Sequence, residues 1–119
     1  AGRRERGPLG VSAEQIAGSQ KGRGPSPIRA IARGGEGHRA LWIYRDGREL
    51  VAQCPGHPAC QSSGDALSLV LDSAPIGNYQ VIGLSSAAAL PPATGSLERD
   101  LGAAIAAGAT WQPQELEVR

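Results

Sequence analysis

One short segment constrains the fold of this 119-residue chain more than any other. Two apolar runs, at residues 40–44 and 49–53, flank the tetrapeptide Arg45-Asp46-Gly47-Arg48. Asp-Gly between apolar runs is a strong hairpin signal, because a type I′ turn needs positive φ at both central residues. The first run contains Trp, Ile and Tyr, which favour strands. An antiparallel β-hairpin is therefore expected here.

The composition supports a β-rich fold and narrows the class of function. Gly and Pro contribute 17 and 9 residues, which argues against a helical bundle or a coiled coil. Because the chain has no Phe and no Met, Leu, Ile, Val and Ala must form most of the core. A net charge of +1 argues against a general polyanion binder, so no nucleic-acid partner is expected. No apolar run approaches the roughly 18 residues of a membrane span.

Other apolar segments predict further strands. Residues 27–32 predict a short edge strand, and residues 79–84 predict a strand that pairs with the one before it. That preceding strand, residues 65–72, places three leucines on one face, Leu67, Leu69 and Leu71, because strand side chains alternate. Residues 114–118 alternate and predict a last strand. The expected total is five or six antiparallel strands.

One helix is expected, at residues 96–107. Ser96 is suited to cap it, and Glu98 and Asp100 place negative charge near its N-terminus, where the helix dipole favours it. Gly108 is suited to the position after its last residue. The helix carries an apolar stripe that is expected to pack on the sheet: Leu97, Leu101, Ala104 and Ile105.

These elements predict a mainly β fold, a small immunoglobulin-like antiparallel β-sandwich at residues 26–119 with one helix in its C-terminal half. Residues 1–25 predict a flexible basic leader, with one short helical turn at residues 11–17. The net charge is +5 over residues 1–39 and −4 over residues 40–119. Such a leader allows proximity to a membrane. The start at Ala1 indicates a processed or shortened chain.

The two cysteines leave three alternatives open. Cys54 and Cys60 form a disulfide in an oxidising compartment, remain free thiols, or bind a metal. In the third case His57 completes a C-x2-H-x2-C pattern, with His38 as a fourth donor of the kind that zinc prefers. The disulfide is the expectation, with no metal and no cofactor.

No catalytic constellation stands out in the sequence. Asp65 and Asp72 bracket one predicted strand and would lie about 23 Å apart along it, whereas paired glycosidase carboxylates lie roughly 5–10 Å apart. Residues 34–37 are Gly-rich but lack the Lys-Ser/Thr of a phosphate loop, and they predict a turn. A small metal-dependent hydrolase that uses His38, His57 and Asp65 is retained as a minor alternative.

Four residues are candidates for binding a ligand or partner: Trp42, Tyr44, His57 and Tyr79. Trp42 and Tyr44 share a face of their strand, so they are either core or, if exposed, a binding surface. The loops at residues 54–64 and 85–95 are expected to meet the partner, because loops on a rigid sheet often carry recognition.

Four short motifs resemble a known family: Lys21-Gly22, the run from Ala40 to Gly47, Gly64-Asp65-Ala66-Leu67, and Tyr79-Gln80-Val81-Ile82. In this order, over about residues 21–111, they resemble the extracytoplasmic β-domains of myxobacterial-type anti-sigma factors and related membrane-anchored regulators. Domains of that family follow a single membrane helix, and related modules accompany caspase-like peptidases. The resemblance implies a turn at Gly64-Asp65 and no catalytic residues.

The expected function is a non-catalytic extracytoplasmic interaction or sensing module of a bacterial envelope regulator. It would act on the periplasmic or extracellular side of the membrane and bind a protein partner. An alternative is a small accessory subunit of a larger envelope or extracellular assembly, docked through its N-terminal arm.

Overall fold

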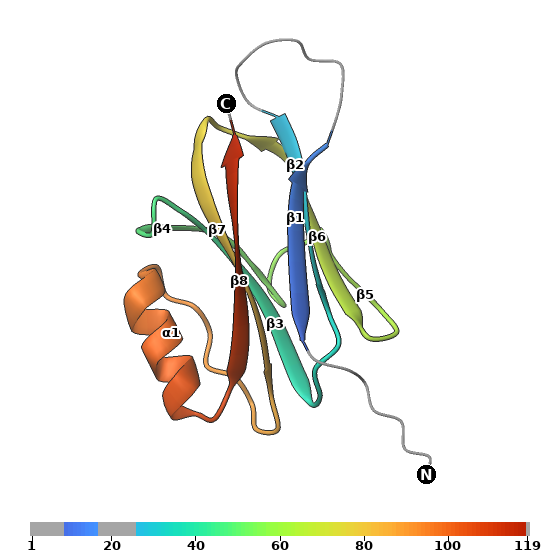
Figure 1. Ribbon diagram of the computed structural model, residues 1–119, viewed down its shortest axis with the longest axis vertical. Helices are drawn as coiled ribbons and strands as arrows, with labels where there is room; N and C mark the ends of the chain where they lie inside the picture. Colours follow the sequence, from blue (N-terminus) through green and yellow to red (C-terminus); the bar gives the residue numbers. More distant parts are fainter. Residues whose placement is uncertain (1–8, 17–25, 119) are drawn as a thin grey trace.

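Two four-stranded antiparallel sheets pack face to face in the structure, a computed structural model that describes residues 9–16 and 26–118 (Figure 1). The first sheet has the order β1 (Gly10–Gln15), β2 (Ser26–Arg33), β6 (Ala66–Ala74), β5 (Cys60–Ser63). The second has the order β4 (Glu49–Cys54), β3 (His38–Arg45), β7 (Gly77–Ser86), β8 (Thr110–Val118). Helix α1 (Leu97–Ala106) connects β7 to β8. The predicted β-sandwich is confirmed.

The strand order is that of an immunoglobulin-like sandwich. The first, second, sixth and fifth strands form one sheet, as strands A, B, E and D do in immunoglobulin domains, and β3, β7 and β8 take the places of strands C, F and G. Strand β4 extends the second sheet beside β3. The distinctive part is the helix, because it lies in the connection between the last two strands.

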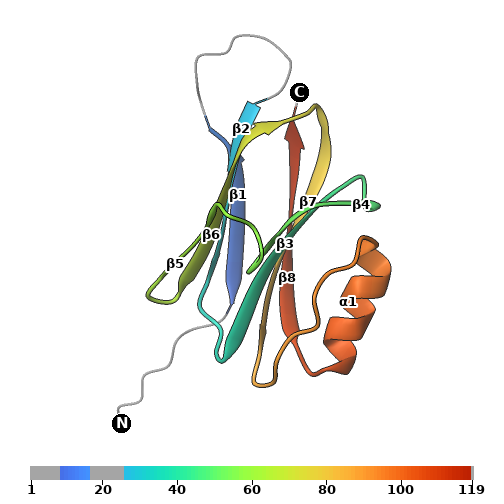
Figure 2. The ribbon, with the colours of Figure 1, turned by 180° about the vertical axis from the view of Figure 1, so that it is seen from behind.

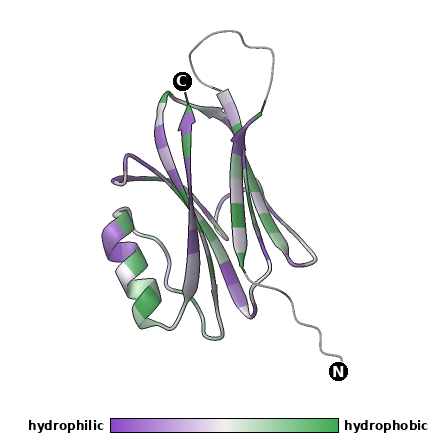
Figure 3. Ribbon diagram, viewed as in Figure 1, coloured by the Kyte–Doolittle hydropathy of each residue, from purple (hydrophilic) through white to green (hydrophobic). Residues whose placement is uncertain are grey.

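The N-terminal boundary of the sandwich differs from the prediction. Residues 10–15, expected in a leader that begins a helical turn at Val11, form strand β1 and pair with β2. Val11 and Ala13 pack against the core, while Gly10, Ser12 and Glu14 are exposed. This alternation is visible along β1 in Figure 3. The side chain of Glu14 meets that of Arg29 on β2 at 2.6 Å. The rest of the predicted leader, residues 1–8 and 17–25, lies outside the described residues.

Three other strands differ in place or extent. The strand predicted at residues 27–32 is β2, which is central rather than at an edge because β1 covers its free side. The polar residues 60–63, expected as a loop, form β5. The last strand begins at Thr110 rather than at residue 114. Its Pro113 is tolerated because β8 is an edge strand of its sheet.

The main core lies between the two sheets. It is built from small and aliphatic residues, with Tyr79 as its one aromatic residue in the described part of the chain. The sheets approach each other closely at Gly83 on β7, where an added Cβ would lie 3.3 Å from the Cβ atoms of both Val11 and Ala32. A side chain at this position would therefore press against the facing sheet.

A second core lies on the outer face of the second sheet, where α1 covers β3 and β7 (Figures 1 and 2). Trp42 and Tyr44 of β3 lie in this core, with ring centroids 6.4 Å apart and ring planes at 81°. Leu97, Leu101 and Ala104 supply the helix side, as predicted. The predicted stripe is wrong at Ile105, which is 50% exposed.

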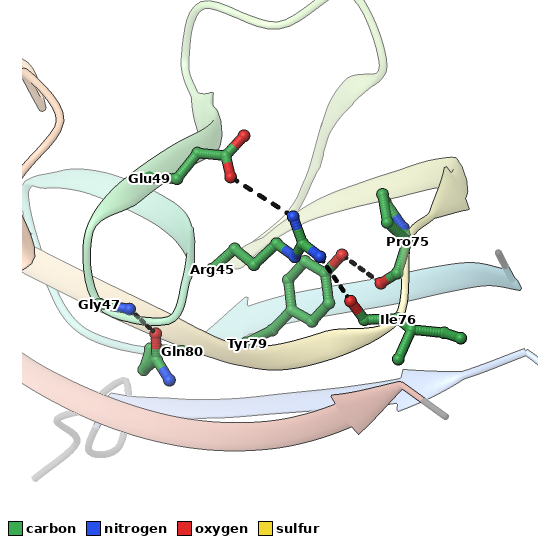
Figure 4. Close-up of polar contacts among 7 residues, drawn as sticks. All are labelled: Arg45, Gly47, Glu49, Pro75, Ile76, Tyr79 and Gln80. Carbon is green, nitrogen blue, oxygen red and sulfur yellow. Dashed lines mark hydrogen bonds and ion pairs between the residues drawn. The ribbon is translucent and has the colours of Figure 1, made fainter. Parts of the chain in front are cut away.

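The predicted hairpin turn is confirmed. Asp46 and Gly47 have φ angles of 55° and 69°, and the N–H of Arg48 donates to the carbonyl of Arg45 at 3.2 Å. Contacts of this turn with the β6–β7 connection are drawn in Figure 4. There Gly47 N–H donates to the Gln80 side chain at 2.7 Å, and the Arg45 guanidinium donates to the Ile76 carbonyl at 2.6 Å.

Tyr79 anchors the same end of the sandwich. Its hydroxyl donates to the carbonyl of Pro75, four residues upstream, at 2.6 Å (Figure 4). This is the arrangement of the tyrosine corner of immunoglobulin-like domains, where the chain passes from one sheet to the other. Burial raises the pKa of Tyr79 above its ordinary value. The residue therefore supports the β6–β7 corner.

A separate finding concerns helix length. Among the described residues, no helix is both long enough and apolar enough to span a lipid bilayer.

The close approach at Gly83 gives a direct test of the packing. Gly83→Val is expected to lower the free energy of unfolding by about 1–3 kcal/mol, because the added methyl groups force the sheets apart. Gly10→Val is the matched control, since an added Cβ on Gly10 meets no atom within 4 Å. Urea unfolding measures both variants, and an equal stability of the two would contradict the described packing.

Candidate functional site

The disulfide predicted between the two cysteines is confirmed. Cys54 and Cys60 are bridged, with their Cα atoms 5.7 Å apart. The bond joins the end of β4 in the second sheet to the start of β5 in the first. It therefore fixes the loop of residues 55–59 at the side of the sandwich. Because both sulfur atoms are bonded to each other, the thiolate ligands of the alternative metal site do not exist.

His57 lies at the tip of this loop and helps to shape it. Its Nδ1 accepts the N–H of Ala59 at 3.0 Å, and its carbonyl accepts the N–H of Cys60 at 3.0 Å. A ring nitrogen that accepts a hydrogen bond carries no proton, so the hydrogen of the neutral ring is on Nε2. His57 is partly exposed and lies beside Ser68 and Asp72 of β6, on the first sheet.

The second predicted loop, residues 85–95, is held against β4 by one side chain. The side-chain nitrogen of Gln53 donates to the carbonyl of Ala93 at 3.2 Å. The side-chain oxygen of Gln53 accepts the backbone N–H of Ala93 at 3.1 Å. These two hydrogen bonds resemble the pair of backbone hydrogen bonds that two opposite residues of antiparallel strands exchange. Gln53 is the residue immediately before Cys54, so the same end of β4 holds both loops.

Asp100 fixes the two residues that follow Ala93. Its carboxylate accepts two hydrogen bonds from Thr94, through the hydroxyl at 2.6 Å and the backbone N–H at 2.9 Å. It also accepts the N–H of Gly95 at 3.0 Å and the hydroxyl of Tyr44 at 2.7 Å. Asp100 is only 3% exposed. Because every partner is a donor, this position needs an ionised carboxylate.

The protonation states of Asp100 and Tyr44 follow from this arrangement. Burial alone would raise the pKa of the Asp100 carboxyl, but the hydrogen bonds from Thr94, Tyr44 and Gly95 stabilise the charged form and hold its pKa below the ordinary value. Burial and the bond to Asp100 raise the pKa of Tyr44 far above its ordinary value. At neutral pH Tyr44 is therefore the donor and Asp100 the charged acceptor.

A pocket of about 220 Å³ lies between the two loops. Cys54 and Pro55 line it from the disulfide side, and residues 89–92 line it from the opposite loop. Gln53, Ala40 and Trp42 complete the apolar and neutral part of the wall. Two loops that are more than 30 residues apart in the sequence thus form one concave surface.

The rim of this pocket is cationic. His38 and Arg39, at the start of β3, are its ionisable lining residues. The Nε of Arg39 donates to the carbonyl of Gly34 at 2.8 Å, which fixes the side chain without neutralising it. His38 is exposed. The pocket therefore combines apolar walls with the positive charge of Arg39.

The four predicted binding residues do not gather at this pocket. Tyr44 and Tyr79 are fully buried and act within the fold. Trp42 contributes to the pocket wall but is only 1% exposed, since α1 and the segment before it cover its face of β3. His57 is accessible but lies over the first sheet. Of the two choices left open for Trp42 and Tyr44, the core is therefore correct.

Two residues that organise the site were missed from the sequence. Asp100 was assigned to the helix dipole, although it lies three residues after Leu97 and four before Ala104, on the buried stripe of the helix. This helical spacing was the signal from which the burial of Asp100 could have been predicted. For Gln53, a polar residue on a strand, the sequence holds no comparable signal.

The residues proposed for metal-dependent hydrolysis do not converge. In the described part of the chain, no group of three or more His, Cys, Asp or Glu side chains is arranged to hold a metal ion. His38 begins β3, His57 lies in the disulfide loop, and Asp65 lies in the turn before β6.

Comparison with known proteins finds no match for this chain among protein-family models, curated proteins or solved structures. The resemblance to anti-sigma extracytoplasmic domains stays a prediction.

The Asp100 cluster gives a test with a defined pH dependence. Asp100→Asn is expected to lower the free energy of unfolding at neutral pH by about 1–3 kcal/mol, because the Asn amide brings N–H donors toward other donors. The folded-state pKa of Asp100 lies below its unfolded value of about 3.9. The stabilisation is therefore present above that value and is lost as the pH falls through the folded pKa.

Urea unfolding at neutral pH and across about pH 5 to 3 measures both effects. The wild type should lose stability more steeply on acidification than Asp100→Asn. Glu98→Gln, at an exposed position in the same helical turn, should behave like the wild type. Parallel pH profiles for wild type and Asp100→Asn would show that the carboxylate does not hold the segment.

Replacing both Cys54 and Cys60 with serine tests the disulfide separately. The small ring is expected to contribute about 2 kcal/mol by restricting the unfolded chain. Thermal unfolding of the double variant should therefore show a lower Tm than that of the oxidised wild type. The reduced wild type serves as the second comparison and should resemble the variant; an unchanged Tm in both would contradict a stabilising bridge.

Proposed function

We propose that this chain is a non-catalytic extracytoplasmic interaction or sensing module of a bacterial envelope regulator. In this proposal the pocket between the disulfide loop and residues 89–92 contacts a partner protein. The observation that carries it is the convergence of two distant loops on one pocket with apolar walls. Rigid sheets that present recognition loops at one side are a common basis for binding.

The size of the pocket favours a protein partner over a metabolite. Small-molecule sites usually enclose roughly 300–1,000 Å³, whereas this pocket encloses about 220 Å³. It has room for one apolar side chain. Interfaces commonly depend on such an anchor, in which one side chain of the partner fills a desolvated pocket and polar contacts surround it.

The charge of the rim indicates the chemistry of the partner. Arg39 is cationic, and it lines the pocket together with His38. A partner segment with an apolar residue next to an Asp or Glu would place the apolar side chain against the pocket wall and the carboxylate near Arg39. The partner segment is therefore an acidic one with an aliphatic or aromatic anchor, and its association rate should fall as salt is added.

The compartment is supported by the disulfide. A bridge between Cys54 and Cys60 is compatible with an extracellular or periplasmic location, because disulfides persist in oxidising environments. The periplasmic or outer side of a bacterial membrane is the location that we propose.

Filling the pocket tests the proposal. A partner captured from an envelope extract by the oxidised protein would be purified, and its Kd measured for the wild type and for Ala89→Trp, which places an indole at the pocket wall. At least tenfold weaker binding is expected, the equivalent of about 1.4 kcal/mol. Ala106→Trp, on the exposed helix surface, is the matched control and should bind normally.

Two results would contradict the proposal. One is equal binding by Ala89→Trp and the wild type. The other is the recovery of no protein by the wild type beyond what Ala89→Trp recovers.

A further inference from the structure

A second, larger cavity lies at one end of the sandwich. Three connections meet there: the turn between β2 and β3, the end of β7, and the turn between α1 and β8. The cavity is open to solvent and has a volume of about 680 Å³, which leaves room for a small molecule. It shares no lining residue with the pocket between the loops.

The wall of this cavity is fixed by glycines. Gly35 has a φ angle of 74°, and an added Cβ would lie 2.7 Å from the Cβ of Ser85. At Gly37, with a φ angle of 78°, an added Cβ would overlap the carbonyl oxygen of Ser86. The β2–β3 turn is therefore packed directly against β7, and the cavity has a preformed floor.

Among the residues that the structure describes, one charged side chain lines the cavity, and it is negative. Glu36 is the only Asp, Glu, Lys, Arg or His among its lining residues. It is exposed, and within residues 9–16 and 26–118 it forms no ion pair. The other polar groups include the Ser85 and Thr110 hydroxyls, which lie 3.0 Å apart. A site with a carboxylate and no lining cation disfavours anions and favours a positive ligand.

An aromatic ring lies on the wall of the same cavity. Trp111 at the start of β8 is 36% exposed, whereas Trp42, the other tryptophan of the chain, is buried. The face of an indole attracts cations more strongly than that of any other side chain. Ligands with quaternary or alkylated ammonium groups combine a positive charge with an apolar surface, and both features match Glu36 and Trp111.

We propose that this cavity is a binding site for a small organic cation, an alkylammonium compound, held between the Trp111 indole and the Glu36 carboxylate. This inference is independent of the partner pocket, since the two sites have separate walls. If the module senses a ligand, as in the proposed function, an alkylammonium compound bound here would be that ligand.

Tetramethylammonium chloride is the probe, compared with sodium chloride at equal ionic strength. Nitrogen–proton NMR resolves the two indole N–H signals of the chain. The Trp111 signal is expected to move in a saturable way with tetramethylammonium only, while that of the buried Trp42 stays in place. Glu36→Gln should weaken binding about fivefold, which is the equivalent of about 1 kcal/mol.

Matched variants separate the site from general surface effects. Glu98→Gln removes an exposed carboxylate elsewhere, and Ile105→Ala removes an exposed apolar side chain elsewhere; both should bind like the wild type. Trp111→Leu, followed through the amides of Gly37 and Thr110, should lose binding. A linear shift that sodium chloride reproduces, or undiminished binding by Glu36→Gln, would overturn the proposal.

Discussion

Strand β3 is buried on both of its faces, and the rest of the structure depends on this constraint. Leu41 and Ile43 point into the core between the sheets, while Trp42 and Tyr44 point outward into the second core. A strand with two apolar faces cannot lie on the surface of a two-layer sandwich, because the outer aromatics would face water. A third layer must cover them, and α1 is that layer.

Helix α1 and the segment before it are held on β3 by specific polar contacts as well as by apolar packing. Tyr44 links β3 to Asp100 of the helix, and the same carboxylate binds Thr94 and Gly95 in the segment before it. Gln53 holds Ala93 against β4, and the disulfide holds the neighbouring loop. The pocket between the loops is thus a consequence of how the outer face of β3 is covered. Both of its walls are anchored to the sheet, so the pocket is preformed.

The sequence predicted those features that local chemistry decides. The Asp46-Gly47 turn, the Cys54–Cys60 bridge and helix α1 each depend on residues close together in the chain, and the structure confirms them. The order of apolar runs predicted the sandwich. Strand β1 was missed because its alternation is short and a helical pattern also fits it.

Features that depend on distant residues were harder to predict. Trp42 and Tyr44 share a strand face in any β-hairpin, but only the position of α1 decides whether that face is core or surface. The role of Asp100 depends on Tyr44, which is 56 residues away in the chain. The pocket between the loops is lined by residues from three separate segments. The sequence predicted two of them as loops but not the point where they meet.

Native-state hydrogen exchange tests the central claim that the covering layer is locked onto β3. The N–H groups of Ala93, Thr94 and Gly95 lie outside the sheets but bind Gln53 and Asp100. If the layer is fixed as described, these amides exchange as slowly as those of Trp42 and Ile43 in β3, only through global unfolding. Rapid exchange at residues 93–95, with β3 still protected, would contradict the account.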